Sequence, residues 1–502
     1  MAHSKEVGLL SRLRARLFGS PEQRERSAQL RKADAEALAY HHGERDREEN
    51  QESQPPSDEA IKICCLWVVE FYGPSQLQNL LDGFARLGWD KRKFDYRDSA
   101  TEFVLKVRKE NGTGAWMGLD AIYSPDYPRR SWMDGITWEL PNGVEFAIPN
   151  LHQVMPSVTA VSLQFVFDDA TAGCFQEILN ETYETNMRKV GARARQYVTP
   201  PTQKAERIEE ARQSLRSRCQ YWFERNLPGV FCTASHPHSF PACEFVTLSK
   251  GLPFTDSEKP RHDYLEILGL DRTWDAWVCQ DIPPIKLGWR TLRLWRDEYL
   301  LLAVNEGEVA AWGAQHPGSA TDGRTLALSQ LGLERWLVRW SLRALFSHYG
   351  SSVIALRDQA LRASSTGVLS RSLRNTQNSL IKLRPDIVAV VEDIESLKEW
   401  GGLLRTSEHK CETLNPHGST KELLQVVLDR VHDEAQRLAM AVRTITDDLL
   451  TSVNLRLQRA IAFYTLATLF LALVAAGFQV FGSCAGTPKN AAPDAPTRNG
   501  SR

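Results

Sequence analysis

A single apolar segment near the C-terminus constrains this chain more than any other feature. Ala460 to Phe481 (AIAFYTLATLFLALVAAGFQVF) contains no charged side chain. A helix of this length spans about 33 Å, which matches the roughly 30 Å hydrocarbon core of a bilayer. Burial in a soluble core is the alternative, but the residues that follow are polar. We therefore predict a single transmembrane helix at 460–481, with the lipid bilayer as its partner, and a disordered tail at 482–502.

Basic residues flank this segment unequally. Arg456 and Arg459 precede it, whereas Lys489 is the nearest basic residue after it. Lys and Arg are in excess on the cytoplasmic side of membrane helices, and Met1 to Ser20 lacks the apolar stretch of a signal peptide. The sequence predicts an inner-membrane or plasma-membrane protein whose N-terminal body is cytoplasmic.

Composition narrows the class of protein further. The 502 residues are 25% charged and 42% hydrophobic, with a net charge of -1. These values exclude a wholly disordered, collagen-like or polytopic membrane chain, and the balanced charge gives no reason to expect nucleic-acid binding. The nine cysteines are irregularly spaced, which indicates reduced thiols and not a disulfide framework.

Two runs of apolar residues before the membrane segment keep the 4-3 spacing of a heptad seam. Pro385 interrupts the first run and should kink the helix or begin a new one, and the capping box Ser419-Thr-Lys-Glu422 begins the second. We predict a helical hairpin that leads into the membrane helix. Self-association through these seams, and packing of both helices on the body, remain open. The seams are Leu369, Leu373, Thr376, Leu380, Leu383, Ile387, Val390, Ile394 and Leu397, then Leu424, Leu428, Val431, Ala435, Leu438, Val442, Ile445 and Leu449.

The remaining chain reads as an α+β body. Ile61 to Phe71 is a near-continuous apolar run that predicts a buried strand, and the helical spacing from Leu77 to Leu87 predicts a helix after it. Pro141-Asn142-Gly143 predicts a hairpin turn. We expect further strands at Glu102–Val107, Gly135–Leu140, Val144–Ile148 and Ala160–Phe167, and helices at Thr171–Gln196 and Gln203–Asn226.

A β-rich subdomain is predicted after these helices, because short strand patterns alternate there with turns. The expected strands are Glu244–Leu248, Ala276–Cys279, Leu292–Trp295, Tyr299–Val304 and Val309–Trp312. Five tryptophans, which could fill a core or line a cleft, fall in the same region: Trp274, Trp277, Trp289, Trp295 and Trp312.

These patterns divide the chain into nine parts. The charged stretch that begins the chain should contain a helix from Ser20 towards His41, and then a linker without apolar anchors. The parts are the charged N-terminal helix and linker (1–59), the α+β domain (60–198), a connecting helix (199–228), the β-rich subdomain (229–325), helices that include the first heptad run (326–400), a loop (401–418), the second heptad helix or stalk (419–459), the transmembrane helix (460–481) and the tail (482–502).

One group of residues has the chemistry of a metal site. Cys232, His236, His238 and Cys243 supply two sulfur and two imidazole ligands of the kind that zinc prefers. Their spacing lacks the paired C-x2-C pattern, and Pro237 lies among them, so an ordinary proline-rich loop is the simpler interpretation. We assign no metal to them.

No catalytic motif accompanies this group. Gly318 to Thr325 has the spacing of a phosphate-binding loop, but Arg324 replaces the required lysine and no strand precedes the loop. We therefore predict no catalytic residue and no cofactor. The leading hypothesis is a non-enzymatic, C-terminally anchored scaffold or sensor. Its helical stalk would hold a large cytoplasmic body that binds or senses a ligand. An enzyme tethered to the membrane is an alternative that would need acids or histidines gathered in a cleft.

An α/β region, a helical hairpin and a long helix that enters the membrane near the C-terminus resemble, in layout, the CorA-like magnesium transporters. The resemblance covers roughly the last quarter of the chain and implies a divergent ion-transport subunit. That family pairs its long helix with a second span through a Gly-Met-Asn loop, and neither follows Val480-Phe481-Gly482-Ser483. No filter residue is carried over. In such a subunit Thr465, Thr468 and Gln479 would line the pore.

Overall fold

The computed structural model describes most of the chain between residues 44 and 444. The described ranges are 44–94, 98–110, 112–127, 135–189, 195–233, 240–255, 263–291, 298–329, 331–365, 385–394, 409–415 and 422–444, with isolated positions at 25, 26, 29, 32, 35, 36, 39, 42, 465 and 468. The chain divides into two compact units, Met1–Leu438 and Ala439–Arg502. All described strands belong to the first unit, which confirms a mixed α+β body.

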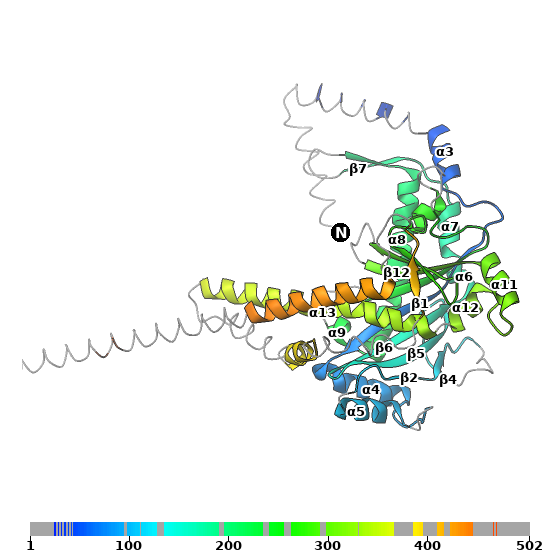
Figure 1. Ribbon diagram of the computed structural model, residues 1–502. Helices are drawn as coiled ribbons and strands as arrows, with labels where there is room; N and C mark the ends of the chain where they lie inside the picture. Colours follow the sequence, from blue (N-terminus) through cyan, green and yellow to red (C-terminus); the bar gives the residue numbers. More distant parts are fainter. Residues whose placement is uncertain are drawn as a thin grey trace, which may run out of the picture. The chain divides into compact units, whose positions relative to one another are not determined.

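A large mixed sheet runs through the first unit (Figure 1). Its described strands follow the order β13-β10-β11-β12-β9-β1-β6-β5-β3-β4, and β2 pairs with β5. The pairs β12–β9 and β3–β4 are parallel and the other pairs are antiparallel. The strands are β1 (Ile61–Tyr72), β2 (Trp116–Gly118), β3 (Ala121–Tyr123), β4 (Gly135–Thr137), β5 (Val144–Met155), β6 (Val158–Phe167), β9 (Ala242–Leu248), β10 (Ala276–Cys279), β11 (Lys286–Thr291), β12 (Glu298–Asn305) and β13 (Cys411–Thr413), with β7 (Asn186–Lys189) and β8 (Arg195–Val198) as a separate ribbon.

Helices cover this sheet on both faces. The described helices of the first unit are α3 (Glu44–Glu52), α4 (Leu77–Leu87), α5 (Ala100–Lys109), α6 (Asp169–Ala172), α7 (Cys174–Asn180), α8 (Pro200–Asn226), α9 (Val230–Thr233), α10 (Tyr264–Leu268), α11 (Glu306–Gln315), α12 (Gly323–Ser329) and α13 (Leu331–Ser365), with a 3-10 turn at Pro74–Gln76. Described helical residues at 385–394 and 423–444 follow them along the chain.

The two faces can be told apart at neighbouring positions of β6. The Phe165 ring lies against Trp222 and Phe223 of α8, whereas the Gln164 side chain donates to the Ala327 carbonyl of α12. Successive side chains of a strand point to opposite faces, so α8 and α12 cover opposite faces of the sheet. This arrangement explains why every residue of β6 is buried.

The central strand β1 confirms the strongest strand prediction. Its apolar sequence is buried at every position except Lys62, and it lies between β6 and β9. Helix α4 follows as predicted, and Gly88 ends it in the left-handed conformation, with φ at 75°.

Strands from the predicted β-rich region continue the same sheet. β9 pairs with β1 on one side and with β12 on the other, so the sheet crosses the sequence boundary near residue 229. Three expected strands of this region are present as β9, β10 and β12. Residues 292–295 lie outside the described part of the chain.

Helix α8 confirms the predicted second long helix. Pro200 and Pro201 occupy its first turn, where a missing N–H costs least. Its buried Arg212 donates from Nε to both carboxylate oxygens of Glu244 on β9, at 3.1 and 2.8 Å. This buried ion pair joins α8 to the centre of the sheet.

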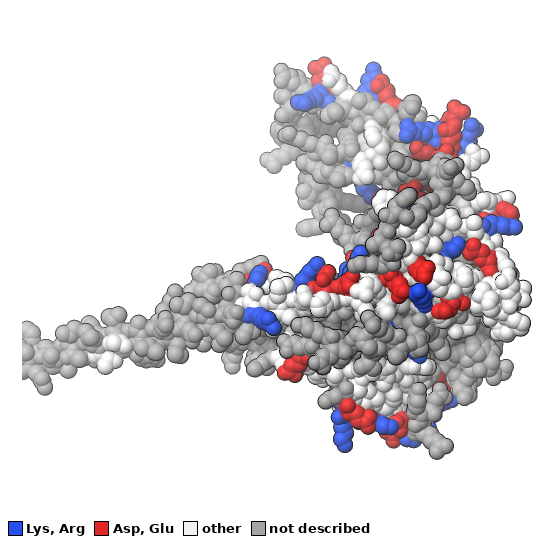
Figure 2. Space-filling model, viewed as in Figure 1, with Lys and Arg blue, Asp and Glu red and all other residues white. Residues whose placement is uncertain are grey.

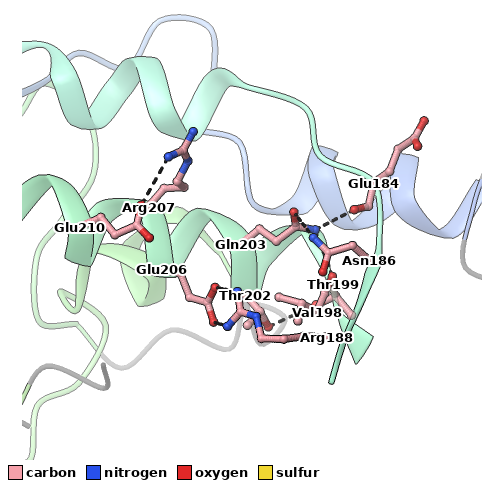
Figure 3. Close-up of polar contacts among 10 residues, drawn as sticks. All are labelled: Glu184, Asn186, Arg188, Val198, Thr199, Thr202, Gln203, Glu206, Arg207 and Glu210. Carbon is pink, nitrogen blue, oxygen red and sulfur yellow. Dashed lines mark hydrogen bonds and ion pairs between the residues drawn. The ribbon is translucent and has the colours of Figure 1, made fainter. Parts of the chain in front are cut away.

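The ribbon β7–β8 is attached to α8 by polar contacts (Figure 3). Arg188 donates two parallel hydrogen bonds to Glu206, at 2.8 and 2.6 Å, and Gln203 donates to the carbonyls of Glu184 and Val198. The predicted helix Thr171–Gln196 is therefore wrong beyond Asn180, because its second half forms this ribbon.

The linker prediction is wrong for Glu44–Glu52, which form α3. Asp46 accepts hydrogen bonds from the backbone N–H and the hydroxyl of Thr185, at 2.8 and 2.6 Å. Asn50 exchanges hydrogen bonds with the backbone of Tyr183. These contacts also occupy backbone groups that a continued helix after Asn180 would use. Hydrogen bonds from Asp46 and Asn50 therefore hold α3 to the body, in place of the apolar contacts that its sequence cannot make.

Two strand predictions are wrong because capping overrides β propensity. Glu102–Val107 lies within α5, where Ser99 and Glu102 form a reciprocal capping box. Val309–Trp312 lies within α11, where the Asn305 side chain accepts from the Glu308 N–H at 3.0 Å.

The predicted hairpin at Pro141-Asn142-Gly143 is wrong in its pairing. The turn itself forms, since the Val144 N–H donates to the Pro141 carbonyl at 3.0 Å and Gly143 has a φ of 83°. However, β4 ends at Thr137 and pairs in parallel with β3, whereas β5 pairs with β6, β3 and β2. A tight turn does not by itself pair the strands on either side of it.

The described part of the first heptad run lies against the body. In helix 385–394, Asp386 accepts from the Ser75 N–H at 2.8 Å and Asp393 accepts from the Ser157 N–H at 2.9 Å, and both also bond the serine hydroxyls. The seam residues Ile387, Val390 and Ile394 are buried. Pro385 is the first described residue of this helix, and the residues before it lie outside the described part of the chain, so the predicted kink or new start at Pro385 stays a prediction.

Helix 423–444 (orange in Figure 1) carries the described part of the second run. Its buried side chains are Leu423, Val427, Val431, Ala435 and Leu438. Leu424 and Leu428 of the predicted seam are only half-buried, so the buried stripe begins one residue earlier. The Arg430 guanidinium lies 4.1 Å from the centre of the Trp289 ring on β11.

The predicted membrane segment lies outside the described residues, apart from Thr465 and Thr468, which are helical and exposed. Among the helices that the structure does describe, none has the length and apolar character needed to cross a bilayer.

Candidate functional site

A cleft of about 1070 Å³ opens beside the C-terminal half of α8. This volume is slightly above the range of about 300–1,000 Å³ that is typical of small-molecule sites. Its walls come from α4, from α8 and from the segment that connects β4 to β5. The residues that give these walls their chemistry are Arg86, Trp138, Glu139, Asn142, Ser214, Ser217, Arg218, Tyr221, Trp222, Arg225 and Asn226.

The residues on α8 follow helical spacing. Ser214, Ser217, Arg218, Tyr221 and Arg225 recur every three or four positions and therefore lie on one face of the helix. This face lies beside the apolar stripe that packs on the sheet. From the sequence this segment was predicted only as a helix, and the spacing of Arg218, Tyr221 and Arg225 was the available signal for a binding surface.

Aromatic side chains in the cleft are held by their N–H groups. Trp138 donates from Nε1 to the Asn226 side chain at 3.1 Å, and Trp222 donates to the Glu139 carbonyl at 2.8 Å. Tyr221 is 59% exposed, and the Arg225 guanidinium lies 5.8 Å from the centre of its ring. The indole rings are thus fixed, while Tyr221 presents an accessible face.

Three guanidinium groups border the cleft. Arg86 donates from Nη1 to the carbonyls of Arg225 and Asn226 at the end of α8, at 2.5 and 3.0 Å. Arg218 donates from Nη1 to the Asn142 carbonyl at 2.7 Å, and its buried Nε–H has no partner among the described residues. A guanidinium has five N–H donors, so donors remain for a ligand. Glu139 is the one carboxylate among the lining residues.

The cysteine–histidine group predicted from the sequence is only partly described. Cys243 is buried in β9, and burial raises the pKa of its thiol. Cys232 lies in α9, and the pKa of its thiol is also raised, by burial first and then by the Glu70 carboxylate. His236 and His238 lie outside the described residues. Zinc binding by this group stays a hypothesis.

The loop from Gly318 to Thr325 is occupied by carboxylates of the chain itself. The Gly323 N–H donates to Glu306 at 2.9 Å, and the Thr325 N–H donates to Asp322 at 2.9 Å. Arg324 forms an ion pair with Glu145. The backbone donors and the cation that a phosphate would need therefore already have partners.

The four described tryptophans of the predicted β-rich region differ in their burial. Trp277 and Trp289 are buried, Trp312 is half-buried and Trp274 is exposed, while Trp295 lies outside the described residues. The cleft uses Trp138 and Trp222 instead.

Charges of both signs alternate over the described surface that Figure 2 shows. No family model, curated protein or solved structure matches this chain. Its function must therefore be argued from its own residues.

Proposed function

We propose that this protein is a membrane-anchored, non-enzymatic ligand-binding protein, a sensor or scaffold, whose body takes up a planar anionic ligand in the cleft beside α8. The observation that carries the proposal is the lining of one cleft by three guanidinium groups and three aromatic rings. Guanidinium groups recognise phosphate and carboxylate through paired hydrogen bonds, and aromatic rings stack on planar ligands.

The lining favours binding over catalysis. It contains no cysteine and no histidine, and Glu139 is its one carboxylate. General acid–base chemistry usually needs a pair of titratable groups in reach of the substrate. Hydrogen-bond donors and ring faces are sufficient for recognition.

Adenosine monophosphate is a suitable probe because it combines a planar ring with a phosphate. We expect saturable binding by calorimetry, and binding that is at least about tenfold weaker for adenosine or inorganic phosphate alone, since each lacks half of the contacts. Arg218→Ala should weaken the binding by about 10- to 100-fold, because it removes a charge-assisted hydrogen bond. Arg207→Ala is the matched control, since Arg207 lies on α8 and pairs with Glu210 away from the cleft.

Absence of saturable binding would refute the ligand class. Equal affinities for the wild type, Arg218→Ala and Arg207→Ala would place the binding elsewhere. Neither result bears on the proposed membrane anchor, which is tested by a separate experiment.

The anchor in this proposal is the segment Ala460 to Phe481, with the body on the cytoplasmic side of an inner or plasma membrane. Its support is the uncharged sequence and the flanking Arg456 and Arg459. The full chain should remain in membranes extracted at alkaline pH, and deletion after Arg459 should release it. A full chain that leaves the membrane under these conditions would end this part of the proposal.

Self-association through the heptad helices is part of the proposal. Leu438 is already buried within a single chain, so a charge there would also disturb the body. Ile445→Glu is the sharper variant, and it should lower the assembled mass measured by light scattering. An unchanged mass would favour use of the seams within one chain.

A further inference from the structure

Side chains that can bind a metal converge where β10 and β13 end the large sheet. The Cys279 sulfur, a carboxylate oxygen of Asp281 and a ring nitrogen of His409 all lie within 4.8 Å of one another. His409 Nδ1 is 3.1 Å from Asp281 Oδ2. These residues come from segments about 130 positions apart in the chain, and the pairing of β10 with β13 brings them together.

A second thiol lies beside this group. Cys411 is directly opposite Cys279 in the antiparallel pairing of β13 with β10. The Gln280 N–H donates to the Lys410 carbonyl at 2.7 Å, so the neighbouring pair Cys279–Cys411 is a non-hydrogen-bonded pair, in which opposite side chains approach most closely. The Cys411 thiol also donates to the His409 carbonyl at 3.7 Å, which places it next to the proposed imidazole ligand.

The Cys279 thiol differs from the Cys64 and Cys174 thiols in the direction in which its pKa is shifted. The hydrogen bond from Cys411 lowers the pKa of Cys279 to about 7, against the effect of burial. Burial instead raises the pKa of Cys64 to about 12 and the pKa of Cys174 to about 11.

The group is also accessible from solvent. The Asp281 side chain is 57% exposed and the His409 side chain is 26% exposed, whereas Cys279 and Cys411 are buried. A metal ion can therefore reach the two thiols past the carboxylate and the imidazole.

We propose that Cys279, Asp281 and His409, whose ligand atoms converge, bind one zinc ion, and that the Cys411 thiol, opposite Cys279 on β13, supplies the fourth ligand. Two sulfurs, one imidazole nitrogen and one carboxylate oxygen form a four-ligand set that zinc accepts in tetrahedral geometry. Four protein ligands leave no open position, which is typical of a structural site. The ion joins the edge strand β13 to β10, and this role is independent of the cleft beside α8.

The test uses the full chain in detergent, kept reduced, loaded with zinc alone and passed through a desalting column. Elemental analysis should find about one zinc per chain. Cys279→Ser and His409→Gln should each weaken zinc binding by about 10- to 100-fold. Cys174→Ser is the matched control, because it removes a sulfur that lies away from the site. Cys232→Ser tests whether the other cysteine–histidine group holds the metal. Both variants should retain the zinc.

Cobalt(II) gives a second readout, the absorption spectrum of the bound metal, which reports sulfur ligands directly. The wild type loaded with cobalt should show thiolate-to-metal charge-transfer bands, and Cys411→Ser should reduce them. A wild type without bound zinc, or equal zinc content in the wild type, Cys279→Ser and His409→Gln, would overturn the proposal. So would a Cys279–Cys411 disulfide, found by mass spectrometry in reduced and zinc-loaded protein.

Discussion

Glu70 makes a quantitative prediction about the pH dependence of stability. Its side chain is fully buried on β1. One carboxylate oxygen accepts from the N–H groups of Phe71 and Phe231, at 2.8 and 2.9 Å, and the other accepts from the N–H of Cys232 at 3.1 Å. Burial raises the pKa of Glu70 from 4.5 to about 7, although these hydrogen bonds oppose it.

The sign of the effect follows from proton binding. Between pH 4.5 and about 7 the folded chain keeps the Glu70 proton, whereas the unfolded chain has lost it. The free energy of unfolding therefore falls as the pH rises through this window, and the contribution is constant above it. Between about pH 5 and about pH 8 the loss amounts to about 2–3 kcal/mol.

Glu70→Gln removes the contribution of Glu70 ionisation to the pH dependence of stability, because glutamine has the shape of the protonated acid and does not ionise. Between about pH 5 and about pH 8, urea unfolding of the wild type should show a loss of stability about 2–3 kcal/mol larger than unfolding of the variant. Glu110→Gln, at the exposed end of α5, is the control and should follow the wild type. If Glu70→Gln also follows the wild type, burial does not control this carboxylate and the reasoning is wrong.

Two further predictions concern local structure. Asp46→Ala should release α3 and speed proteolysis of residues 44–59, because it leaves the buried Thr185 N–H unsatisfied at a cost of about 1–3 kcal/mol. The control Glu48→Ala, at an exposed position on the same helix, should not change the rate of digestion. Equal digestion rates for the two variants would refute the anchoring role of Asp46. Gly88→Ala and Gly143→Ala both place a side chain at positive φ, but a Cβ at Gly88 meets open space and one at Gly143 meets the Thr171 hydroxyl. In urea unfolding, Gly88→Ala should lower the free energy of unfolding by about 1–2 kcal/mol, and Gly143→Ala should lower it clearly more. Equal losses for the two variants would show that the contact with Thr171 has no effect on stability.

Local patterns predicted the elements whose signals lie within a few residues. β1 followed from an apolar run, and α4 followed from helical spacing that ends at Gly88. The capping box Ser99–Glu102 is also visible in the sequence, but it was not used, and Glu102–Val107 was predicted as a strand. Capping hydrogen bonds satisfy backbone groups that β propensity leaves out of account.

The candidate cleft could be anticipated only in part. The spacing of Arg218, Tyr221 and Arg225 on α8 is visible in the sequence. Arg86 and Trp138 join them because α4 and the segment before β5 pack beside α8, and no local pattern reports that packing.

The sequence by itself determined which segments are apolar enough to form strands, helices or the expected membrane span, because those properties depend on neighbouring residues. Only the tertiary structure decided which strands pair and which polar groups meet. It paired β4 with β3, bonded Asp46 to Thr185, and brought Cys279 beside Cys411 and His409. Such contacts join residues far apart in the chain, and their geometry depends on how the entire sheet packs.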